Sequence, residues 1–438
     1  MREAPAFAAM SRFDALTAAA RVLSSDQADR RARAAALACM VGLAVVLGVG
    51  RFAFTPLLPL MLADGSIGLK AGSWLASANY AGYFVGAVSC AALRVAPARI
   101  VRFGLAATVL LTAAMGVGHW LSVWLVVRFV AGVVSAWTFV FMSQWGLRRL
   151  AELHAPEWSG VIYAGPGVGI VATGLIGSAL AGQRAAVGWL GFAALSAVLS
   201  LAIWRTFGAA QASIPAPRAQ AMPPAAVPHT AAGGSAPPAA RAGTRGHRAD
   251  AAWLVALYGA PGFGYIITAT FLPVIARAAL PAGSPWPDLF WPMFGAALIV
   301  GAITAARLPG HWDNRLLLAA GCATQALGIA AGIVWPNAAG FSIGSALLGL
   351  PFTAITLFAM REARRLQGER AAGLMGYATA SYGVGQILGP LVAAPLVAAP
   401  LVARYASFTP VLWLAAAVLL AGAAGFAAIA VARRHRTG

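Results

Sequence analysis

Two arginines lie inside long apolar segments of this chain, Arg51 within 34–62 and Arg128 within 121–147. An arginine near the centre of a membrane span costs about 2.5–3.5 kcal/mol on insertion scales, so it must face a polar cavity or a partner. In such a place a guanidinium could bind an anionic group through two parallel hydrogen bonds. Alternatively, Arg51 could pair with backbone carbonyls and tyrosine hydroxyls and so hold its helix against its neighbours.

No Asp, Glu or His occupies the middle of an apolar segment, because the acidic residues fall in linkers, tails and segment ends. Two unpaired guanidiniums in the first half therefore predict a positive cavity. A proton relay through a buried carboxylate is disfavoured. Asp64, Glu157 and Asp250 lie near segment ends, where they could still titrate.

Twelve apolar segments must position these arginines. Hydrophobic residues make up 60% of the chain and charged residues 10%, whereas soluble domains carry roughly 25% charged residues. Stretches of about 20 apolar residues span a bilayer as helices. We expect spans at 34–62, 73–95, 98–118, 121–147, 158–182, 185–206, 250–279, 287–307, 314–335, 338–360, 371–399 and 408–432.

The basic residues indicate the orientation in the membrane. Between the spans, four basic residues fall on one side, and all the others fall on the opposite side; the four are Lys70, Arg184, Arg277 and Arg404. This asymmetry predicts a multi-pass protein of the bacterial inner membrane with both termini in the cytoplasm. The net charge of +19 is thus explained by contact with the lipid bilayer. We expect no nucleic-acid partner, because no nucleic-acid-binding motif is present.

A segment rich in Pro and Ala, 207–249, separates the sixth span from the seventh. Its composition predicts a disordered cytoplasmic linker. The expected organisation is an N-terminal extension (1–33), a first six-helix bundle (34–206), this linker, a second six-helix bundle (250–432) and a tail (433–438).

The two halves share sequence elements. Gly48-Val-Gly50 and Gly262-Phe-Gly264 are each followed at the same distance by Leu-Pro. Gly-Pro pairs also lie within the fifth span, at Gly165-Pro166, and within the eleventh, at Gly389-Pro390. Matched pairs of this kind indicate an internal repeat, which is typical of secondary transporters.

With these motifs the chain resembles the major facilitator superfamily over nearly its whole length. Arg128 and Gly132 match its RxxxG element, and Gly165, Pro166 and Gly169 match its GPxxG element. The string 48–61, GVGRFAFTPLLPLM, with NYAGY at 79–83, resembles the YbfB/YjiJ-type bacterial branch. The basic loop 94–102 lacks the usual aspartate of the superfamily, whereas the loop 307–315 contains Asp313.

The resemblance implies an all-α membrane protein with 12 transmembrane helices in two pseudo-symmetric six-helix bundles, whose first, fourth, seventh and tenth spans line a central cavity. The residues expected to line the substrate cavity are Arg51, Thr55, Tyr265, Thr268, Thr353 and Thr356. The residues expected to serve gating or coupling are Arg128, Gly132, Gly165, Pro166, Gly169, Gly385, Gly389 and Pro390.

We therefore expect a secondary active transporter that moves a small organic solute, of anionic character, by alternating access. Two alternatives stay open: efflux of neutral or cationic hydrophobic compounds, and a membrane sensor or scaffold that transports nothing. We expect no enzymatic activity, catalytic residue, metal or cofactor, and a monomeric protein. The absence of a GxxxxGK[ST] phosphate-binding loop argues against an ATP-driven pump.

Overall fold

The computed structural model describes residues 27–208, 238–367, 371–397 and 408–437, which form helices and the turns between them without a strand. The helical elements are the first helix, Gln27–Ala63, which contains η1 (Ala44–Phe52) and α2 (Phe54–Ala63), then α3 (Leu69–Ser89), η2 (Cys90–Ala92), α4 (Pro97–Val117), α5 (Leu121–Glu152), η3 (Pro156–Trp158), α6 (Ser159–Ala179), α7 (Ala185–Ile203), η4 (Trp204–Phe207), α8 (Pro238–Ala279), α9 (Trp286–Arg307), α10 (Asn314–Val334), α11 (Ala338–Gly349), α12 (Phe352–Gln367), α13 (Ala371–Val397) and α14 (Thr409–Thr437).

Within this described part, ten helices are long and apolar enough to cross a membrane, with α11 and α12 counted as one. Large apolar side chains point outward along them; Leu110, Val198 and Leu201 are 69%, 64% and 72% exposed. Exposed apolar surface on this scale is unfavourable in water and indicates a lipid environment.

The predicted spans 73–95 and 371–399 are also helical, as α3 and α13, but they are not among these ten. Helix α3 is less apolar because it carries Lys70, Ser73, Ser77 and Asn79. Helices α3 and α13 pack against each other, and the Ser77 hydroxyl donates to the backbone oxygen of Ile387 across this interface.

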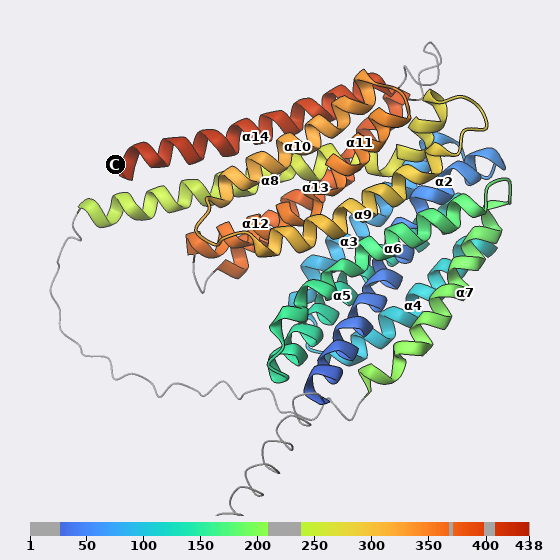
Figure 1. Ribbon diagram of the computed structural model, residues 1–438, viewed down its shortest axis with the longest axis horizontal. Coiled ribbons are helices and arrows are strands. Elements are labelled where there is room, and N and C mark those ends of the chain that lie inside the picture. The colour runs from blue at the N-terminus through green and yellow to red at the C-terminus, as the bar shows by residue number, and fades with distance from the viewer. Residues whose placement is uncertain (1–26, 209–237, 368–370, 398–407, 438) are drawn as a thin grey trace, which may run out of the picture.

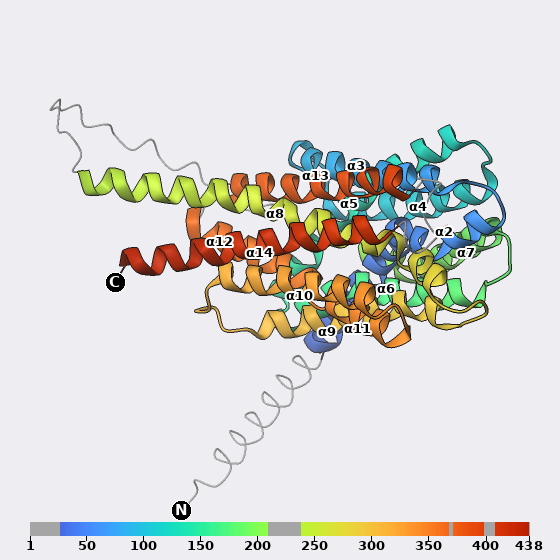
Figure 2. The ribbon, with the colours of Figure 1, turned by 90° about the horizontal axis from the view of Figure 1, so that it is seen from above.

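The helices form two groups in space. The elements from the first helix to α7 gather on one side of Figure 1, and α8 to α14 gather on the other. Between the groups, α3 packs on α13, α6 packs on α9, and α2 contacts α8. In Figure 2 the α3–α13 pair and the α6–α9 pair lie on opposite sides of the molecule. The site described below lies where the two groups meet.

Several helices are longer than their predicted spans. The first helix begins at Gln27 and not at Ala34, and α14 continues to Thr437. Helix α8 begins at Pro238, within the predicted linker 207–249, of which residues 209–237 lie outside the described part. The alanines and arginines of 238–249 have high helix propensity, and proline is favoured at a helix start, so this stretch extends the helix.

Glycines of the matched elements bring helices into backbone contact. A Cβ on Gly48 of the first helix would overlap the backbone of Gly169 on α6. In the second group, a Cβ on Gly262 would overlap the backbone of Tyr382, and one on Gly385 that of Gly259. The repeated glycines therefore join corresponding helices in each half, the first with the fifth span and the seventh with the eleventh.

The other predicted gating residues lie at similar contacts. A Cβ on Gly132 would overlap the backbone oxygen of Asn79, one on Gly165 would overlap Met40, and one on Gly389 would overlap Ile266. Pro166 and Pro390 lie inside α6 and α13. Close packing accounts for the small residues at these positions, and their role in gating stays a prediction.

A charged cluster fixes one end of the second group. Arg315 donates to Asp313 at 3.1 Å and lies 3.7 Å from Glu362, which also binds Arg365 at 2.6 Å. Arg315 further approaches Asp250 to 3.9 Å. Asp313 caps α10 by accepting from the Arg315 backbone N–H. This cluster joins the start of α10 and the last turns of α12 to Asp250 within α8.

The corresponding end of the first group is held differently. Arg102 donates to the backbone oxygen of Trp204 at 3.2 Å, and its guanidinium lies 5.3 Å from the centroid of the Trp204 ring. The loop 94–102 has no aspartate that could pair with Arg102. A backbone carbonyl and an aromatic face are the partners of this arginine in place of a carboxylate. We call this end of both groups, which carries Arg31, Arg149, Arg315 and Arg365, the arginine-rich end.

We predict that Gly132→Ala destabilises the protein by about 1–3 kcal/mol, because the added methyl group forces the backbones of α5 and α3 apart. Gly191→Ala on α7 is the matched control, since an added Cβ there meets only open space. Thermal unfolding in detergent measures both. Equal unfolding temperatures for the two variants would contradict the packing argument.

We predict that the stabilising effect of Asp313 disappears in acid. Burial alone would raise the pKa of Asp313, but the hydrogen bonds and charge of Arg315 more than offset this and hold the pKa below its usual value. The carboxylate therefore stabilises the fold above about pH 4, and this contribution is lost as the pH falls through the lowered pKa. Unfolding temperatures of the wild type and Asp313→Asn should differ at pH 7 and converge below about pH 4. A gap that does not change with pH would contradict this.

Candidate functional site

Arg51 lies where the first helix departs from α-helical geometry. Residues Ala44–Phe52 form a π-helix, a turn follows at Ala53, and α2 starts at Phe54. Pro56 has no N–H to donate to the carbonyl four residues earlier, which interrupts the regular hydrogen-bond ladder at this point. Short π-helical stretches are frequent at functional sites. The Arg51 residue is 6% exposed, so its charge is removed from water.

The partners of Arg51 are neutral. Its Nη2 donates to Oε1 of Gln386 on α13 at 2.9 Å. The guanidinium carbon lies 4.1 Å from the ring centroid of Tyr83 and 5.2 Å from that of Tyr80, both on α3. Nε has no hydrogen-bond partner. An arginine from one helix group is thus bound to an amide from the other, with no carboxylate partner among the described residues.

Gln386 extends this contact to Tyr265. Its Nε2 donates to the hydroxyl of Tyr265 on α8. Tyr265 occupies the position in the second half that Arg51 occupies in the first, and its ring stacks on Tyr382 and meets Phe352 edge-on. Arg51 and Tyr265, which the repeat predicts as equivalent cavity residues, therefore contact the same glutamine.

Aromatic rings continue from Tyr265 back to Arg51. Phe352 contacts Phe294, Phe294 stacks on Trp291 at 5.1 Å, and Trp291 meets Phe52 at 6.0 Å. The Phe52 ring lies 5.3 Å from the Arg51 guanidinium. We call Arg51, Phe52, Tyr265, Trp291, Phe294, Phe352 and Gln386 the central ring. It combines one cation with flat apolar walls, a combination suited to an amphipathic anion.

Arg128 positions Arg51. Its Nη1 and Nη2 donate to the backbone oxygens of Gly50 and Arg51, each at 3.3 Å, and Phe54 covers its guanidinium at 4.8 Å. Asn79 donates to the Arg128 backbone oxygen at 2.9 Å. The two arginines are therefore neighbours. The Arg128 guanidinium binds the backbone of the turn that carries Arg51, so it holds this turn in position.

Thr55 belongs to a set of polar contacts between the two groups. Its hydroxyl donates to the backbone oxygen of Ala269 at 3.2 Å, and the Tyr80 hydroxyl lies 3.0 Å from that of Thr270. We call these two contacts the inter-group ties. Both lie beside Arg51 toward the Ala63 end of the first helix, where they join it and α3 to α8.

The other three predicted cavity residues do not join the central ring. Thr268 lines a separate cavity of about 20 Å³ within the second group, together with Gly328 and Phe341. Thr353 is half-buried, and its hydroxyl has no hydrogen-bond partner. Thr356 is exposed and bonds to Tyr258. Of the six predicted cavity residues, Arg51 and Tyr265 therefore lie in the central ring and Thr55 lies beside it. The role of all six in substrate binding stays a prediction.

Sequence reasoning missed the importance of Gln386 and Trp291. Gln386 is a polar residue between Gly385 and Gly389 in a helix of small and apolar residues, which is a signal that could have selected it. Trp291 carries no comparable signal, because its role depends on which helix faces Phe52.

Comparison with known proteins agrees with this architecture. A family model described as uncharacterised MFS-type transporter YbfB matches residues 43–426. No curated protein matches the chain. Among solved structures, the nucleoside transporter NupG aligns with a TM-score of 0.66 and 13% identity over 91% of this chain and 98% of that one. A single-residue variant of NupG aligns with a TM-score of 0.64 and 15% identity over 90% of this chain and 99% of that one.

These structural neighbours share the fold of the chain, and the family match covers most of its length. Together with the apolar helices they describe a multi-pass membrane transporter and not an enzyme. The chain belongs to the YbfB-type family of the major facilitator superfamily.

Proposed function

We propose that this protein is a secondary transporter that carries a small organic anion across the bacterial inner membrane, with Arg51 as the anion-binding residue. The observation behind the proposal is that Arg51 is buried between the two helix groups and that its side-chain hydrogen-bond partners, Gln386 and Tyr83, are neutral. A buried charge without a counter-charge is costly, and a substrate carboxylate or phosphate would neutralise it.

The proposed mechanism uses contacts from both helix groups. Arg51 belongs to the first group, and Gln386 and Tyr265 belong to the second. An anion bound to Arg51 competes with Gln386 for the same Nη2 donor, so binding weakens one contact that holds the groups together. Substrate binding is thereby coupled to the relative movement of the groups, which is what alternating access requires.

The proposed architecture is twelve spans in two pseudo-symmetric bundles, 34–206 and 250–432, with the arginine-rich end and both termini in the cytoplasm. In this orientation the inter-group ties lie on the periplasmic side of Arg51. Opening toward the periplasm then requires the contacts of Thr55 and Tyr80 with α8 to break. Arg128 would keep the Arg51 turn intact during this movement, and the helix contacts at Gly165, Pro166, Gly169, Gly385, Gly389 and Pro390 would allow it to rotate.

Export is favoured over uptake, because the Gly165-Pro166 element resembles that of antiporters. The second candidate, efflux of neutral or cationic hydrophobic compounds, is supported by the aromatic walls of the central ring. The charge of the preferred ligand separates the two candidates. A sensor or scaffold would instead bind a ligand without moving it across the membrane.

We predict that carboxylates stabilise the purified protein and that their uncharged amides do not. Thermal-shift titrations with matched acid and amide pairs measure this. Arg51→Ala should weaken acid binding about 10- to 100-fold, the effect of losing a charge-assisted hydrogen bond of roughly 1.5–3 kcal/mol. Arg184→Ala, an exposed arginine away from the site, is the control. Stabilisation by neutral or cationic compounds alone, unchanged in Arg51→Ala, would reject the anion proposal.

We predict that Gln386→Glu blocks anion binding while it stabilises the ligand-free protein, because it places a carboxylate beside Arg51. Gln325→Glu is the control, since Gln325 is equally buried and bonds to the backbone oxygen of Leu348, not to an arginine. That variant should be destabilised and should keep the anion response. Unfolding temperatures with and without ligand, and substrate flux in proteoliposomes, test both. Full anion transport by Gln386→Glu would contradict the proposed role of Arg51.

A further inference from the structure

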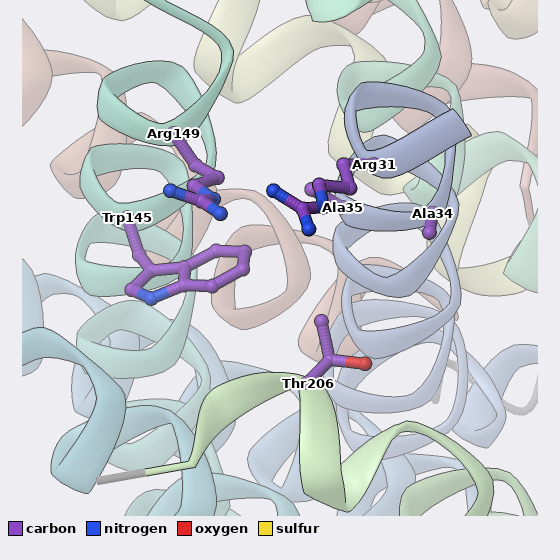
Figure 3. Close-up of a pocket in the computed structure, with 6 residues that line it drawn as sticks. All are labelled: Arg31, Ala34, Ala35, Trp145, Arg149 and Thr206. Carbon is purple, nitrogen blue, oxygen red and sulfur yellow. The ribbon is translucent and has the colours of Figure 1, made fainter. Parts of the chain in front are cut away.

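A second cavity lies far from the central ring, at the arginine-rich end of the first helix group. It has a volume of about 390 Å³ and is lined by Arg31, Ala34, Ala35, Trp145, Arg149 and Thr206. These residues come from the start of the first helix, the last turns of α5 and η4 (Figure 3). The cavity therefore opens between three elements that pack within the first group.

Two guanidiniums face each other across this cavity. Figure 3 shows Arg31 and Arg149 directed toward one another, with the Trp145 ring and Thr206 on the walls below them. Two like charges that face each other repel. An anion between them would reverse this effect.

Among the residues that the structure describes, carboxylates do not balance these charges. Glu152 binds Arg149 at 3.0 Å, but it also binds Arg148 at 3.2 Å, so one carboxylate is shared by two guanidiniums. Arg31 makes no ion pair within the described residues. The cavity therefore keeps an excess of positive charge, with two planar donors arranged for a tetrahedral oxyanion.

The surroundings of the cavity indicate a lipid as the source of that anion. Trp145 packs on Phe207 at 4.7 Å between ring centroids, and Trp158 and Trp204 lie at the same end of the helices. Tryptophan is enriched at the level of lipid headgroups. Toward the apolar interior, Leu37 of the first helix and Leu201 of α7, the helix that η4 continues, are exposed and available to acyl chains.

We infer that this cavity binds the phosphodiester headgroup of an anionic phospholipid, with Arg31 and Arg149 as its ligands and Trp145 and Thr206 as its walls. Basic pockets between transmembrane helices commonly hold such headgroups. The bound phosphate bridges the first helix to α5 and thereby stabilises the end of the first group, where Glu152 alone cannot neutralise the arginines. This site is independent of the central ring and of what the protein transports.

The test is the thermal stability of the full-length protein, purified in detergent and supplemented with phosphatidylglycerol, phosphatidylethanolamine or glycerol 3-phosphate. We expect phosphatidylglycerol to raise the unfolding temperature by several degrees and the other two to have little effect. Arg31→Gln with Arg149→Gln should remove most of this shift. Arg205→Gln, an exposed arginine of η4 that does not line the cavity, should keep it. Native mass spectrometry should show retained phosphatidylglycerol in the wild type and less in the double variant.

Three results would overturn the proposal: equal stabilisation by phosphatidylethanolamine, an equal loss in Arg205→Gln, or an unchanged shift in the double variant. A full shift with glycerol 3-phosphate alone would assign the cavity to a soluble phosphate compound and would also reject the lipid. If the double variant does not fold, Arg31→Gln alone decides the question, because this exposed side chain makes no ion pair in the described structure.

Discussion

The rest of the site depends on one constraint, which is that the Arg51 guanidinium is buried away from water. A guanidinium in an apolar protein needs partners, and here they are an amide from the other helix group and the aromatic rings of Phe52 and Tyr83. Arg128 adds a second buried charge, but it is directed at backbone oxygens and fixes the turn that carries Arg51. The two arginines share an environment and differ in role because only one of them faces the second group.

Backbone contacts between helices make this arrangement possible. Because glycine has no side chain, two helices can approach until their backbones are in contact, as they are at Gly48 and Gly169. The corresponding contact in the second group involves Gly262 and Tyr382, and Tyr382 is also a stacking partner of Tyr265. Close packing thus fixes the aromatic side chains of the site in position, and packing and binding depend on the same residues.

The sequence was sufficient to predict an all-helical membrane protein, because the length and apolar character of its segments report directly on the bilayer. The orientation that the arginines indicate stays a prediction. The sequence also identified Arg51, since a charge within an apolar segment is conspicuous, and the repeat then selected Tyr265. It did not identify Gln386 as the residue joining them, because that contact depends on the packing of α3 against α13. Thr268 was misplaced for a related reason: a helix has several faces, and the one that carries Thr268 faces the interior of the second group.

The π-helical stretch Ala44–Phe52 has a consequence for how this helix should be probed. Its turns hold more residues than those of the α-helix that follows, so the angular position of a side chain cannot be extrapolated from one part to the other. A helical wheel drawn through both parts assigns residues near Arg51 to the wrong face. A cysteine-accessibility scan of the first helix must therefore use one periodicity for residues 27–43 and 54–63 and another for residues 44–52, with changes at Ala44 and Ala53.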